Sequence, residues 1–374
     1  MGKVRVCING MTENEQVRGP VRYIYEIVNN MPHGELDLYL IAGSWQKQVY
    51  GPLEKRIKVF YYDINRSKVF RAIFFIIFVP WFLRKNKIEV YHIPDTNPLP
   101  LFRNNTRIVS TIHACAEFVV PIRFSAIQSF YRRLISHIQA KYSDLIITVS
   151  NSSKSDIIKY HSIENEKIKV VYNGVSVIRE RDSGDGSDIG ISKPNKYILY
   201  VGVIEKVKNV ELLVKAYAKL PNNVKSDVSL VLVGRKGNAY KDVQAIVDSE
   251  GLQSDVIIYG YLNDNQLANM YKDALLFVYV SEYEGFGLPI LESMALGVPV
   301  LTSNKSSMKE IAGNAAILAE TNVDDIKNKM QLLLGNEKMR EEYKNRGFKL
   351  IDKFEWKKAS KETCDIYKQL LAIN

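Results

Sequence analysis

The sequence is poor in cysteine, and its first residues do not have the pattern expected of a leader segment. Its three cysteines are far apart, and none belongs to a Cys-x-x-Cys pair or a Cys/His cluster. This spacing argues against a disulfide framework and a zinc site, so we expect Cys7, Cys115 and Cys364 to be plain core residues. No charged leader or small-residue cleavage site precedes the first strand-like run, which predicts a cytoplasmic location.

A long apolar stretch is also missing. The longest one covers residues 72–83, which is 12 residues, and contains Pro80, whereas a helix that spans a bilayer needs about 20. Two interpretations stay open. In the first, the segment is a helix covered on both sides inside an α/β domain. In the second, the segment and the basic residues that flank it, from Lys68 to Lys87, contact anionic lipid at the inner face of the membrane.

The net charge of +10 is confined to the first half of the chain. Up to Gly174 there are 24 Lys and Arg residues against 14 Asp and Glu residues, whereas the remainder has 27 of each kind. A basic surface attracts nucleic acid, anionic lipid or phosphorylated substrates. No recognisable nucleic-acid-binding module is present, so we expect no nucleic-acid partner.

Short β-branched runs alternate with longer helical segments throughout the chain. This alternation predicts a parallel α/β architecture, and 374 residues exceed what one core usually organises. A Gly-, Ser- and Asp-rich segment, residues 179–196, predicts a linker or surface loop. The predicted strands are 4–8, 36–41, 57–61, 90–92, 107–112, 145–149, 197–201, 229–233, 256–259, 276–280 and 298–302.

The most informative stretch is SEYEGFGLPILESMALGVPVLTS, residues 281–303. It follows a predicted strand, passes through a glycine-containing turn and enters a helical pattern in which Pro289 suits the first turn. The free N–H groups at such a helix start are a natural place for diphosphate or sugar oxygens. Glu284 lies at the mouth of the loop and Glu292 within the helix, so both carboxylates could face one cleft.

These residues resemble the signature of the family-4 retaining glycosyltransferases of the GT-B fold, in which two glutamates flank a GFG-type loop. The resemblance implies two Rossmann-like domains whose parallel sheets face each other across a cleft. Residues 1–174 would form the acceptor-side domain and residues 175–355 the nucleotide-sugar-binding domain. A C-terminal helix, residues 356–374, would cross back to the first domain.

The same resemblance assigns roles to the signature. Glu284 would lie against the donor sugar, and Glu292 would accept hydrogen bonds from the ribose hydroxyls. The backbone amides that would meet sugar hydroxyls and phosphate belong to Gly285, Phe286, Gly287 and Leu288.

The segment YVGVIEKVKNVELLVKAYAKL resembles the part of the family that brings a basic pair to the diphosphate. Lys208 occupies the lysine position, where a cation stabilises the leaving group. The residue after Gly202 is often arginine in the family, but here it is Val203. Lys206 and Arg235 are the candidates for the second phosphate cation.

The first half resembles the family at two further segments. Gly19, in RGPVRYIYEIV, matches a glycine that lets the backbone approach the donor diphosphate, although a simple strand-to-helix turn also explains it. His113, in VSTIHACAEF, matches the active-site histidine that would touch the donor sugar, although the family's following aspartate is Ala114 here. We expect His92 to be structural, and Ser150, Ser152 and Ser153 to serve as candidates for a helix cap.

The resemblance implies a retaining hexosyltransferase with Glu284, His113 and Lys208 as its catalytic residues. It would move a hexose from a nucleoside-diphosphate sugar to a saccharide acceptor, lipid-linked or soluble, in cell-surface polysaccharide or glycolipid synthesis. The nucleotide sugar is a co-substrate, and no cofactor or metal is expected because the chain contains no Asp-x-Asp triplet. The alternatives are a sugar-nucleotide epimerase of similar fold and an inactive nucleotide-sugar-binding partner subunit.

Overall fold

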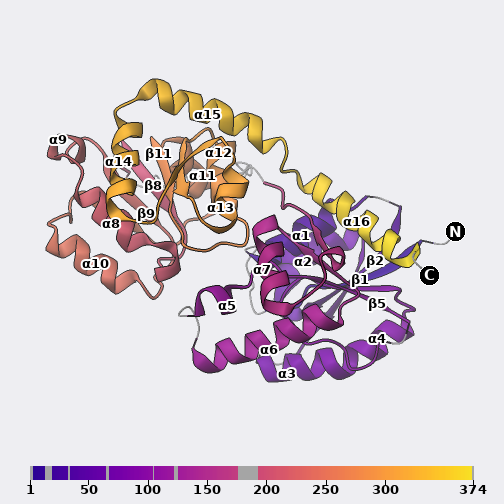
Figure 1. Ribbon diagram of the computed structural model, residues 1–374. Helices are drawn as coiled ribbons and strands as arrows, with labels where there is room; N and C mark the ends of the chain where they lie inside the picture. Colours follow the sequence, from indigo (N-terminus) through magenta and orange to yellow (C-terminus); the bar gives the residue numbers. More distant parts are fainter. Residues whose placement is uncertain are drawn as a thin grey trace. The chain divides into compact units, whose positions relative to one another are not determined.

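The computed structural model describes residues 3–12, 19–32, 34–64, 67–103, 105–121, 125–175 and 193–372. Contacts divide the chain into two compact units (Figure 1). Unit 1 consists of Met1–Gly174 and Glu355–Asn374, and unit 2 consists of Val175–Phe354. Most of the predicted linker, including its three aspartates, lies outside the described residues.

Unit 1 contains a parallel sheet of seven strands in the order β3-β2-β1-β4-β5-β6-β7. The six predicted strands are confirmed within two residues at each end, and the short β7 was not predicted. The strands are β1 (Val4–Asn9), β2 (Leu36–Gly43), β3 (Lys58–Tyr62), β4 (Val90–Ile93), β5 (Arg107–Thr111), β6 (Leu145–Thr148) and β7 (Ile168–Val170).

Helices flank this sheet, and α7 begins after Ser150, one of the three serines that were candidates for a helix cap. The Ser150 hydroxyl accepts a hydrogen bond from the Ser153 amide at 3.0 Å, which satisfies one of the free donors at the start of α7. The α-helices of unit 1 are α1 (Pro20–Asn29), α2 (Lys47–Tyr50), α3 (Lys68–Ile73), α4 (Val79–Lys85), α5 (Ala116–Val119), α6 (Ala126–Tyr142), α7 (Asn151–His161) and α16 (Trp356–Ala372). They are joined by the 3₁₀ helices η1 (Ser44–Gln46), η2 (Gly51–Lys55) and η5 (Asn165–Lys167) and by the π-helix η3 (Phe74–Phe78).

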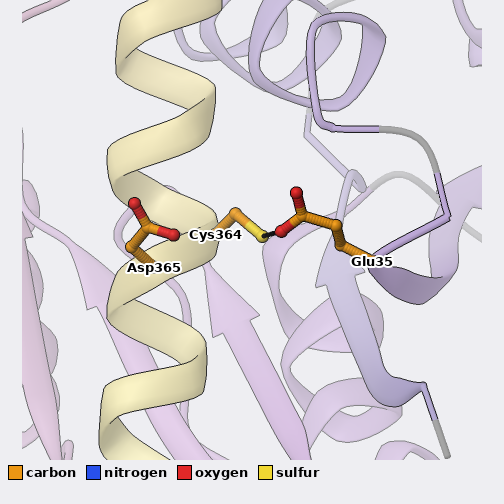
Figure 2. Close-up of side chains that lie close together, drawn as sticks. All are labelled: Glu35, Cys364 and Asp365. Carbon is orange, nitrogen blue, oxygen red and sulfur yellow. Dashed lines mark hydrogen bonds between the residues drawn. The ribbon is translucent and has the colours of Figure 1, made fainter.

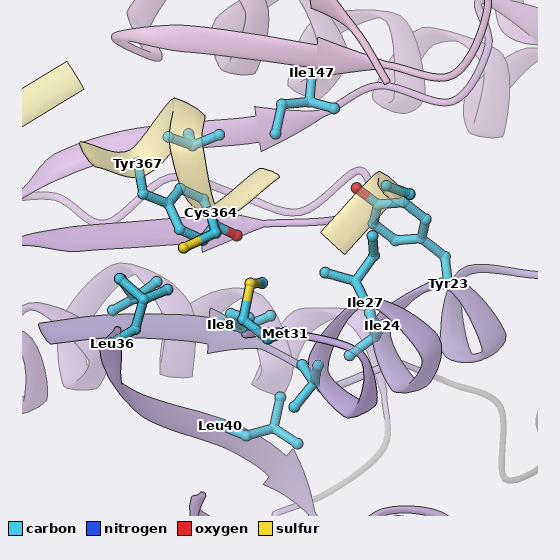
Figure 3. Close-up of a cluster of buried hydrophobic side chains, with 14 of the residues drawn as sticks. Ile8, Tyr23, Ile24, Ile27, Met31, Leu36, Leu40, Ile147, Cys364 and Tyr367 are labelled. Atoms are coloured by element: carbon cyan, nitrogen blue, oxygen red, sulfur yellow. The ribbon is translucent and has the colours of Figure 1, made fainter. Parts of the chain in front are cut away.

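The C-terminal helix α16 is part of the core of unit 1. Cys364 of α16 lies beside Glu35 at the start of β2 (Figure 2). Tyr367 is fully buried among side chains of α1 and β1, including Ile8 and Ile27 (Figure 3). Burial of each such side chain contributes roughly 1.5–3 kcal/mol, so α16 adds several kcal/mol to the stability of unit 1.

The apolar segment at residues 72–83 is covered on one face only. Phe75 and Phe82 are buried, whereas Ile73, Ile77 and Trp81 are 49, 65 and 53% exposed. These three residues are four positions apart and therefore share one face of the continuous helical stretch α3-η3-α4. The expectation of a helix covered on both sides is wrong. Among the described residues, no helix has the length and apolar character needed to cross a membrane.

Unit 2 contains a parallel sheet of six strands in the order β10-β9-β8-β11-β12-β13. The five predicted strands are confirmed, whereas β13 was not predicted because its sequence, AILA, is low in β-branched residues. The strands are β8 (Tyr197–Val201), β9 (Ser229–Val233), β10 (Val256–Tyr259), β11 (Leu276–Tyr279), β12 (Val300–Ser303) and β13 (Ala316–Ala319).

The helices of unit 2 include α12, which starts one residue before Pro289 as the sequence predicts. The full set is α8 (Val210–Ala218), α9 (Asn222–Lys225), α10 (Tyr240–Ser249), α11 (Asp264–Lys272), α12 (Leu288–Ala295), α13 (Ser306–Ala312), α14 (Val323–Leu334) and α15 (Glu337–Ile351), together with the single turn η6 (Lys206–Lys208).

Each sheet reverses its direction of winding once. In unit 1 the chain passes from β1 to β2 on one side and later to β4 on the other, and in unit 2 the strand β8 lies between β9 and β11 in the same way. Ligands of open parallel sheets bind at the carboxyl ends of the strands beside such a reversal. The loops after β1 and β4, and those after β8 and β11, are therefore the places to look for sites.

Candidate functional site

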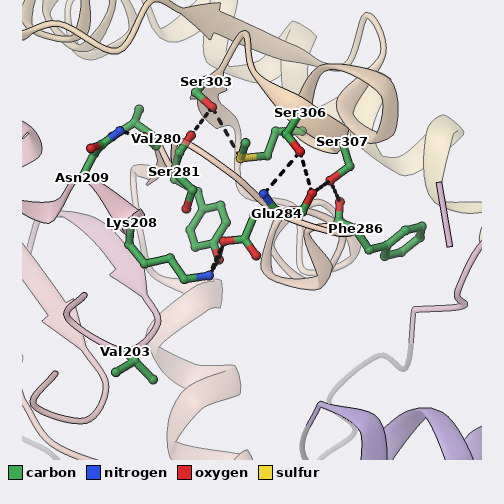
Figure 4. A network of polar contacts seen from close by, with 12 residues as sticks. Val203, Lys208, Asn209, Val280, Ser281, Glu284, Phe286, Ser303, Ser306 and Ser307 are labelled. Carbon is green, nitrogen blue, oxygen red and sulfur yellow. Dashed lines mark hydrogen bonds and ion pairs between the residues drawn. The ribbon is translucent and has the colours of Figure 1, made fainter. Parts of the chain in front are cut away.

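Lys208 and Glu284 meet at the reversal point of unit 2. Lys208 follows β8, Glu284 follows β11, and their side chains form an ion pair between Nζ and Oε1 (Figure 4). The Tyr279 hydroxyl joins them, since it accepts a hydrogen bond from Lys208 Nζ at 2.8 Å and donates one to Glu284 Oε1 at 2.7 Å. The sequence predicted both charged residues but not the tyrosine that connects them.

Glu284 is held in its charged form. Burial opposes ionisation of the carboxyl group, but the Lys208 ammonium and the hydrogen bonds from Lys208 and Tyr279 outweigh it and lower the pKa of Glu284. The side chains of Lys208 and Glu284 are only 12 and 17% exposed. A carboxylate and an ammonium are thus positioned at one small, mostly desolvated place, where charge acts strongly on a bound ligand.

Two serines of α13 hold the glycine turn at residues 284–287. The hydroxyls of Ser306 and Ser307 donate to the Glu284 carbonyl at 2.7 and 2.8 Å, and Ser307 also approaches the Phe286 carbonyl at 3.1 Å (Figure 4). Sequence reasoning missed both serines. The available signal was their position just after β12, the strand that pairs with β11.

The turn itself exposes backbone rather than side chains. The Phe286 ring is buried and lies edge-on to Phe354, with ring centroids 5.9 Å apart. Gly287 has a φ of 103°, which only glycine adopts without strain, and it leads into α12 at Leu288. Of the first three residues of α12, Pro289 has no N–H and the Ile290 amide donates to the Gly287 carbonyl at 3.0 Å, so the Leu288 amide is the one that suits an anionic or hydroxyl-rich ligand.

Glu292 lies deeper in unit 2 than Glu284. It is 7% exposed, and Tyr271 Oη donates a hydrogen bond to its Oε2 at 3.3 Å. The two glutamates therefore have different partners, although they belong to one strand-turn-helix unit.

The two candidates for the second phosphate cation lie in neighbouring loops after β8 and β9. Lys206 is exposed and pairs with Asp242, with 3.4 Å between Nζ and Oδ2. Arg235 is also exposed. The loops approach closely, since a Cβ atom on Gly234 would lie 1.9 Å from the Gly202 carbonyl oxygen.

In unit 1, His113 follows β5 and Gly19 starts α1. Gly19 is the N-cap residue of α1 with a φ of 51°, as a tight entry to that helix requires. The Nε2 atom of His113 lies 2.9 Å from the Pro94 carbonyl oxygen, which can only accept, so Nε2 carries the proton. Burial lowers the pKa of His113 in spite of the opposing influence of Asp95 and the Pro94 carbonyl. The imidazole is therefore neutral, and its Nδ1 is an acceptor for which the described part of the chain offers no hydrogen-bond donor.

His92 is the centre of a buried hydrogen-bonded chain. Its Nδ1 lies 2.6 Å from Tyr367 Oη and its Nε2 lies 2.7 Å from Thr111 Oγ1, which is 3.1 Å from Tyr23 Oη. The Tyr23 ring in turn lies edge-on to His113, with 4.8 Å between centroids. Burial lowers the pKa of His92 to about 3, which fits the structural role expected for it. This row of hydrogen-bonded side chains, with the Tyr23 ring at its end, connects α16 with His113.

One group of side chains in the described residues has the spacing of metal ligands. Glu35, Cys364 and Asp365 offer atoms within 4.8 Å of one another (Figure 2). Glu35, however, pairs with Lys368, and burial raises the pKa of the Cys364 thiol to about 11. Because a metal needs the thiolate, these residues fit a contact that holds α16 in place better than they fit a metal site.

Comparison with known proteins assigns a family to both units. The model described as Glycosyltransferase Family 4 matches residues 17–179, and the model described as Glycosyl transferases group 1 matches residues 186–350. The O-antigen chain mannosyltransferase B of Escherichia coli is 31% identical over 305 residues, which cover 78% of this chain and 77% of that protein. The chain belongs to the family-4 glycosyltransferases.

A second relative and two solved structures extend this comparison. An N-acetylgalactosaminyltransferase of Campylobacter jejuni, whose name gives a diphospho-undecaprenol acceptor, is 28% identical over 250 residues, 66% of this chain and 65% of that protein. The structure of a glycosyltransferase from Rickettsia africae aligns over 99% of this chain and 99% of its own, with 18% identity and a TM-score of 0.74. The structure of Anabaena HepE with UDP and glucose aligns over 98% of this chain and 100% of its own, with 14% identity and a TM-score of 0.73. These structures show that the fold is GT-B.

Proposed function

We propose that this glycosyltransferase moves a hexose from a nucleoside-diphosphate sugar to a saccharide acceptor with retention of configuration. The observation that carries the proposal is the Lys208–Tyr279–Glu284 cluster beside the glycine turn at the reversal point of unit 2. A half-buried carboxylate next to a half-buried ammonium suits a reaction in which the sugar becomes positive while the departing diphosphate gains negative charge.

In the proposed step, the bond between the sugar C1 and the diphosphate oxygen breaks, and the acceptor hydroxyl oxygen bonds to C1 on the same face. The departing phosphate oxygen takes the acceptor proton. Lys208 would turn toward the diphosphate, and the amides of residues 285–288 would share its charge, while Glu284 would lie beside the sugar. His113 would accept a hydrogen bond from a sugar hydroxyl through its free Nδ1.

The same proposal gives roles to the remaining site residues. Glu292 would bind the ribose, and Gly19 and Gly202 would allow the backbone to approach the diphosphate. Of the two phosphate-cation candidates, we favour Arg235, because Lys206 already pairs with Asp242. We also propose that no metal or other cofactor takes part, so an excess of EDTA should leave turnover unchanged. Loss of activity that magnesium restores would refute this.

A thermal-shift panel of UDP-, GDP- and dTDP-sugars would identify the donor. Because two relatives are named O-antigen chain mannosyltransferases, a GDP-mannose donor is the first to test. A ligand that binds only the folded chain raises its melting temperature in proportion to the logarithm of its concentration. Transfer of labelled sugar to an acceptor supports the proposal. Isomerisation of the free nucleotide sugar would indicate an epimerase instead, and binding without turnover would indicate a partner subunit.

For the acceptor, we propose a lipid-linked saccharide of surface polysaccharide or glycolipid synthesis, used at the inner face of the membrane. Two features support it: the confinement of the excess positive charge to residues 1–174 and the exposed apolar face of α3-η3-α4. Each Lys or Arg near an anionic bilayer contributes about 1 kcal/mol. The chain should therefore sediment with anionic vesicles more than with neutral ones, and salt should reduce this binding. Failure to bind either kind at low salt, with full activity on a soluble oligosaccharide, would refute the membrane contact.

A further inference from the structure

Tyr23 of α1 packs against both His113 and the start of α16. Its ring stands edge-on to His113, with 4.8 Å between the ring centroids and 87° between the ring planes. It also lies at a steep angle to Trp356, the first residue of α16, with 6.2 Å between the centroids. Because Tyr23 is buried, these neighbours and the partner of its hydroxyl group decide where the ring lies.

The hydroxyl group of Tyr23 ends a row of four buried polar side chains. Hydrogen bonds join Tyr23 to Thr111, Thr111 to His92, and His92 to Tyr367 of α16. We call these four side chains the buried row, and Figure 3 shows its two ends, Tyr23 and Tyr367. None of the four is more than 3% exposed. The row therefore ties the Tyr23 ring to β4, β5 and α16.

The buried row can make all its hydrogen bonds with either neutral form of His92. If Nε2 carries the ring proton, it donates to Thr111, and Nδ1 accepts from the Tyr367 hydroxyl. If Nδ1 carries the proton, it donates to Tyr367, while Nε2 accepts from Thr111 and Thr111 accepts from Tyr23. Burial lowers the pKa of His92 to about 3 and raises the pKa of Tyr23 to about 12, so neither group changes its charge near neutral pH. The row is thus a fixed support.

His113 has a second anchor at Pro94. Its Nε2 donates to the Pro94 carbonyl at 2.9 Å, and this segment is itself held, because Gln139 Nε2 donates to the Asp95 carbonyl at 3.0 Å. The segment borders a cavity of about 210 Å³, whose charged lining residues are Arg71, Asp95 and Arg132. A hydrogen bond at Nε2 fixes one atom of the imidazole but not its plane. The edge-on contact with Tyr23 restricts the plane.

From these two contacts we propose that Tyr23 is a positioning residue, whose ring fixes the plane of the His113 imidazole and keeps Nδ1 directed toward the donor sugar. The inference rests on the proposed function, in which Nδ1 accepts a hydrogen bond from a sugar hydroxyl. A site residue keeps its productive geometry when neighbouring side chains lock its rotamer. Tyr23 and Gly19 also share the first turn of α1, since the Tyr23 amide donates to the Gly19 carbonyl at 3.1 Å. One turn would therefore set both the approach to the diphosphate and the plane of the histidine.

The first test needs no substrate and measures the tautomer of His113 in the full chain by ¹⁵N NMR of its ring nitrogens, with His113→Gln to assign the signals. In the wild type the Nε2–H tautomer should dominate, because the Pro94 carbonyl can only accept. Tyr23→Leu removes the ring and should let the imidazole leave that carbonyl, so the shifts of the two nitrogens should converge. A single Nε2–H tautomer in folded Tyr23→Leu would overturn the proposal.

Two other substitutions at Tyr23 separate the ring from the hydroxyl group. Tyr23→Phe keeps the ring but loses the hydrogen bond to Thr111, so it should retain the Nε2–H tautomer of His113. Equal changes in Tyr23→Phe and Tyr23→Leu would overturn the role of the ring. If the leucine variant does not fold, Tyr23→Met, which is also unbranched by a ring and similar in volume to leucine, takes its place.

The second test is a double-mutant cycle on turnover, with labelled GDP-mannose as the first donor and UDP- and dTDP-sugars after it. Tyr23→Leu should lower kcat by roughly 10–100-fold, as expected for a misplaced site group, and should change KM for the donor much less. In a His113→Ala background, Tyr23→Leu should have no further effect, because no imidazole remains to be positioned. A loss of the same size in both backgrounds would indicate a general structural effect and overturn the positioning role.

Tyr91→Leu is the matched control. Tyr91 is a buried tyrosine of unit 1, as Tyr23 is, but it belongs to a different core cluster, which includes Phe82 and Ile108. Its replacement should lower stability without changing the tautomer of His113 or the kcat of the folded chain. A change of tautomer in Tyr91→Leu as large as in Tyr23→Leu would contradict a specific role for Tyr23.

The two tests also separate failure of this inference from failure of the proposed function. If no nucleotide sugar is turned over, or if His113→Ala keeps wild-type turnover, the proposed function or its use of His113 fails, and the NMR measurement still decides whether Tyr23 holds the imidazole. An impaired His113→Ala together with an unaffected Tyr23→Leu refutes only the positioning role.

Discussion

Units 1 and 2 have the same kind of doubly wound parallel sheet but differ in their charge and in their titratable groups. All five histidines and the whole excess of positive charge belong to residues 1–174, whereas the remainder is charge-balanced and has no histidine. The ion pair of unit 2 is half-buried and held by Tyr279 and two serines, while unit 1 combines an arginine-lined cavity with exposed apolar helices. The shared topology thus decides where a ligand site lies, and the side chains decide what it binds.

The largest expected difference between the units is their response to acid. Burial lowers the pKa of His92 to about 3 and that of His161 to about 4, whereas both take up a proton near pH 6.5 in the unfolded chain. The unfolded state therefore binds more protons below pH 6.5, and unit 1 should lose about 1.4 kcal/mol per pH unit for each histidine. In unit 2, the lowered pKa of Glu284 costs stability only as pH falls below about 4.5.

Differential scanning calorimetry and hydrogen exchange between pH 6.5 and 4.5 test this difference. Protection in unit 1 should fall first, and His92→Gln should reduce the slope, whereas replacement of the exposed His137 by Gln should change it less. An equal loss of protection in both units would contradict the prediction.

The second prediction concerns the half-buried cation of unit 2, Lys208. Lys208→Ala should lower turnover by roughly 10²–10³-fold, because the ammonium would meet charge that grows as the diphosphate leaves. Initial rates of sugar transfer are the measurement. Lys206→Ala is the matched control, since that lysine is exposed and paired with Asp242, and its effect should be much smaller. If Lys208→Ala retains wild-type turnover while folded, another cation stabilises the leaving group.

The third prediction separates donor binding from folding at Glu292. Glu292→Ala should weaken binding of the donor nucleotide by about 1.5–3 kcal/mol through loss of a charged hydrogen bond to the ribose. Isothermal titration calorimetry measures this affinity. Tyr271→Phe removes the tyrosine's hydrogen bond to Glu292 but keeps the carboxylate, so it should cost less. Unchanged nucleotide affinity in folded Glu292→Ala would remove this residue from the site.

The smallest expected effect arises in the buried chain that joins α16 to His113. Tyr367→Phe would leave the Nδ1 atom of His92 without its partner and should lower the free energy of unfolding of unit 1 by about 1–3 kcal/mol. Chemical denaturation followed by tryptophan fluorescence would report it through Trp356 of α16, which is buried near Tyr23. A variant as stable as the wild type would mean that the hydrogen bond between Tyr367 and His92 contributes no net stability.

Some errors of the sequence-based prediction have clear physical causes. Strand β13 was missed because alanine-rich runs carry little strand preference, and its place in the sheet depends on pairing with β12. Ser306 and Ser307 looked like ordinary polar residues, because their role depends on the adjacency of β11 and β12. The apolar run at residues 72–83 could not be assigned to one or two buried faces, since periodicity is lost when every position is apolar.

The sequence by itself determined the α/β class, eleven of the strands, the strand-turn-helix unit around Glu284 and the family, because these follow from local periodicity and from a contiguous motif. Only the tertiary structure decided which residues meet across the strands. It paired Lys208 with Glu284, 76 positions apart, linked Tyr367 to His92, and brought Arg71 and Arg132 to one cavity. Such contacts depend on strand order and on which helix face remains uncovered, and neither property is encoded in the neighbouring residues of the chain.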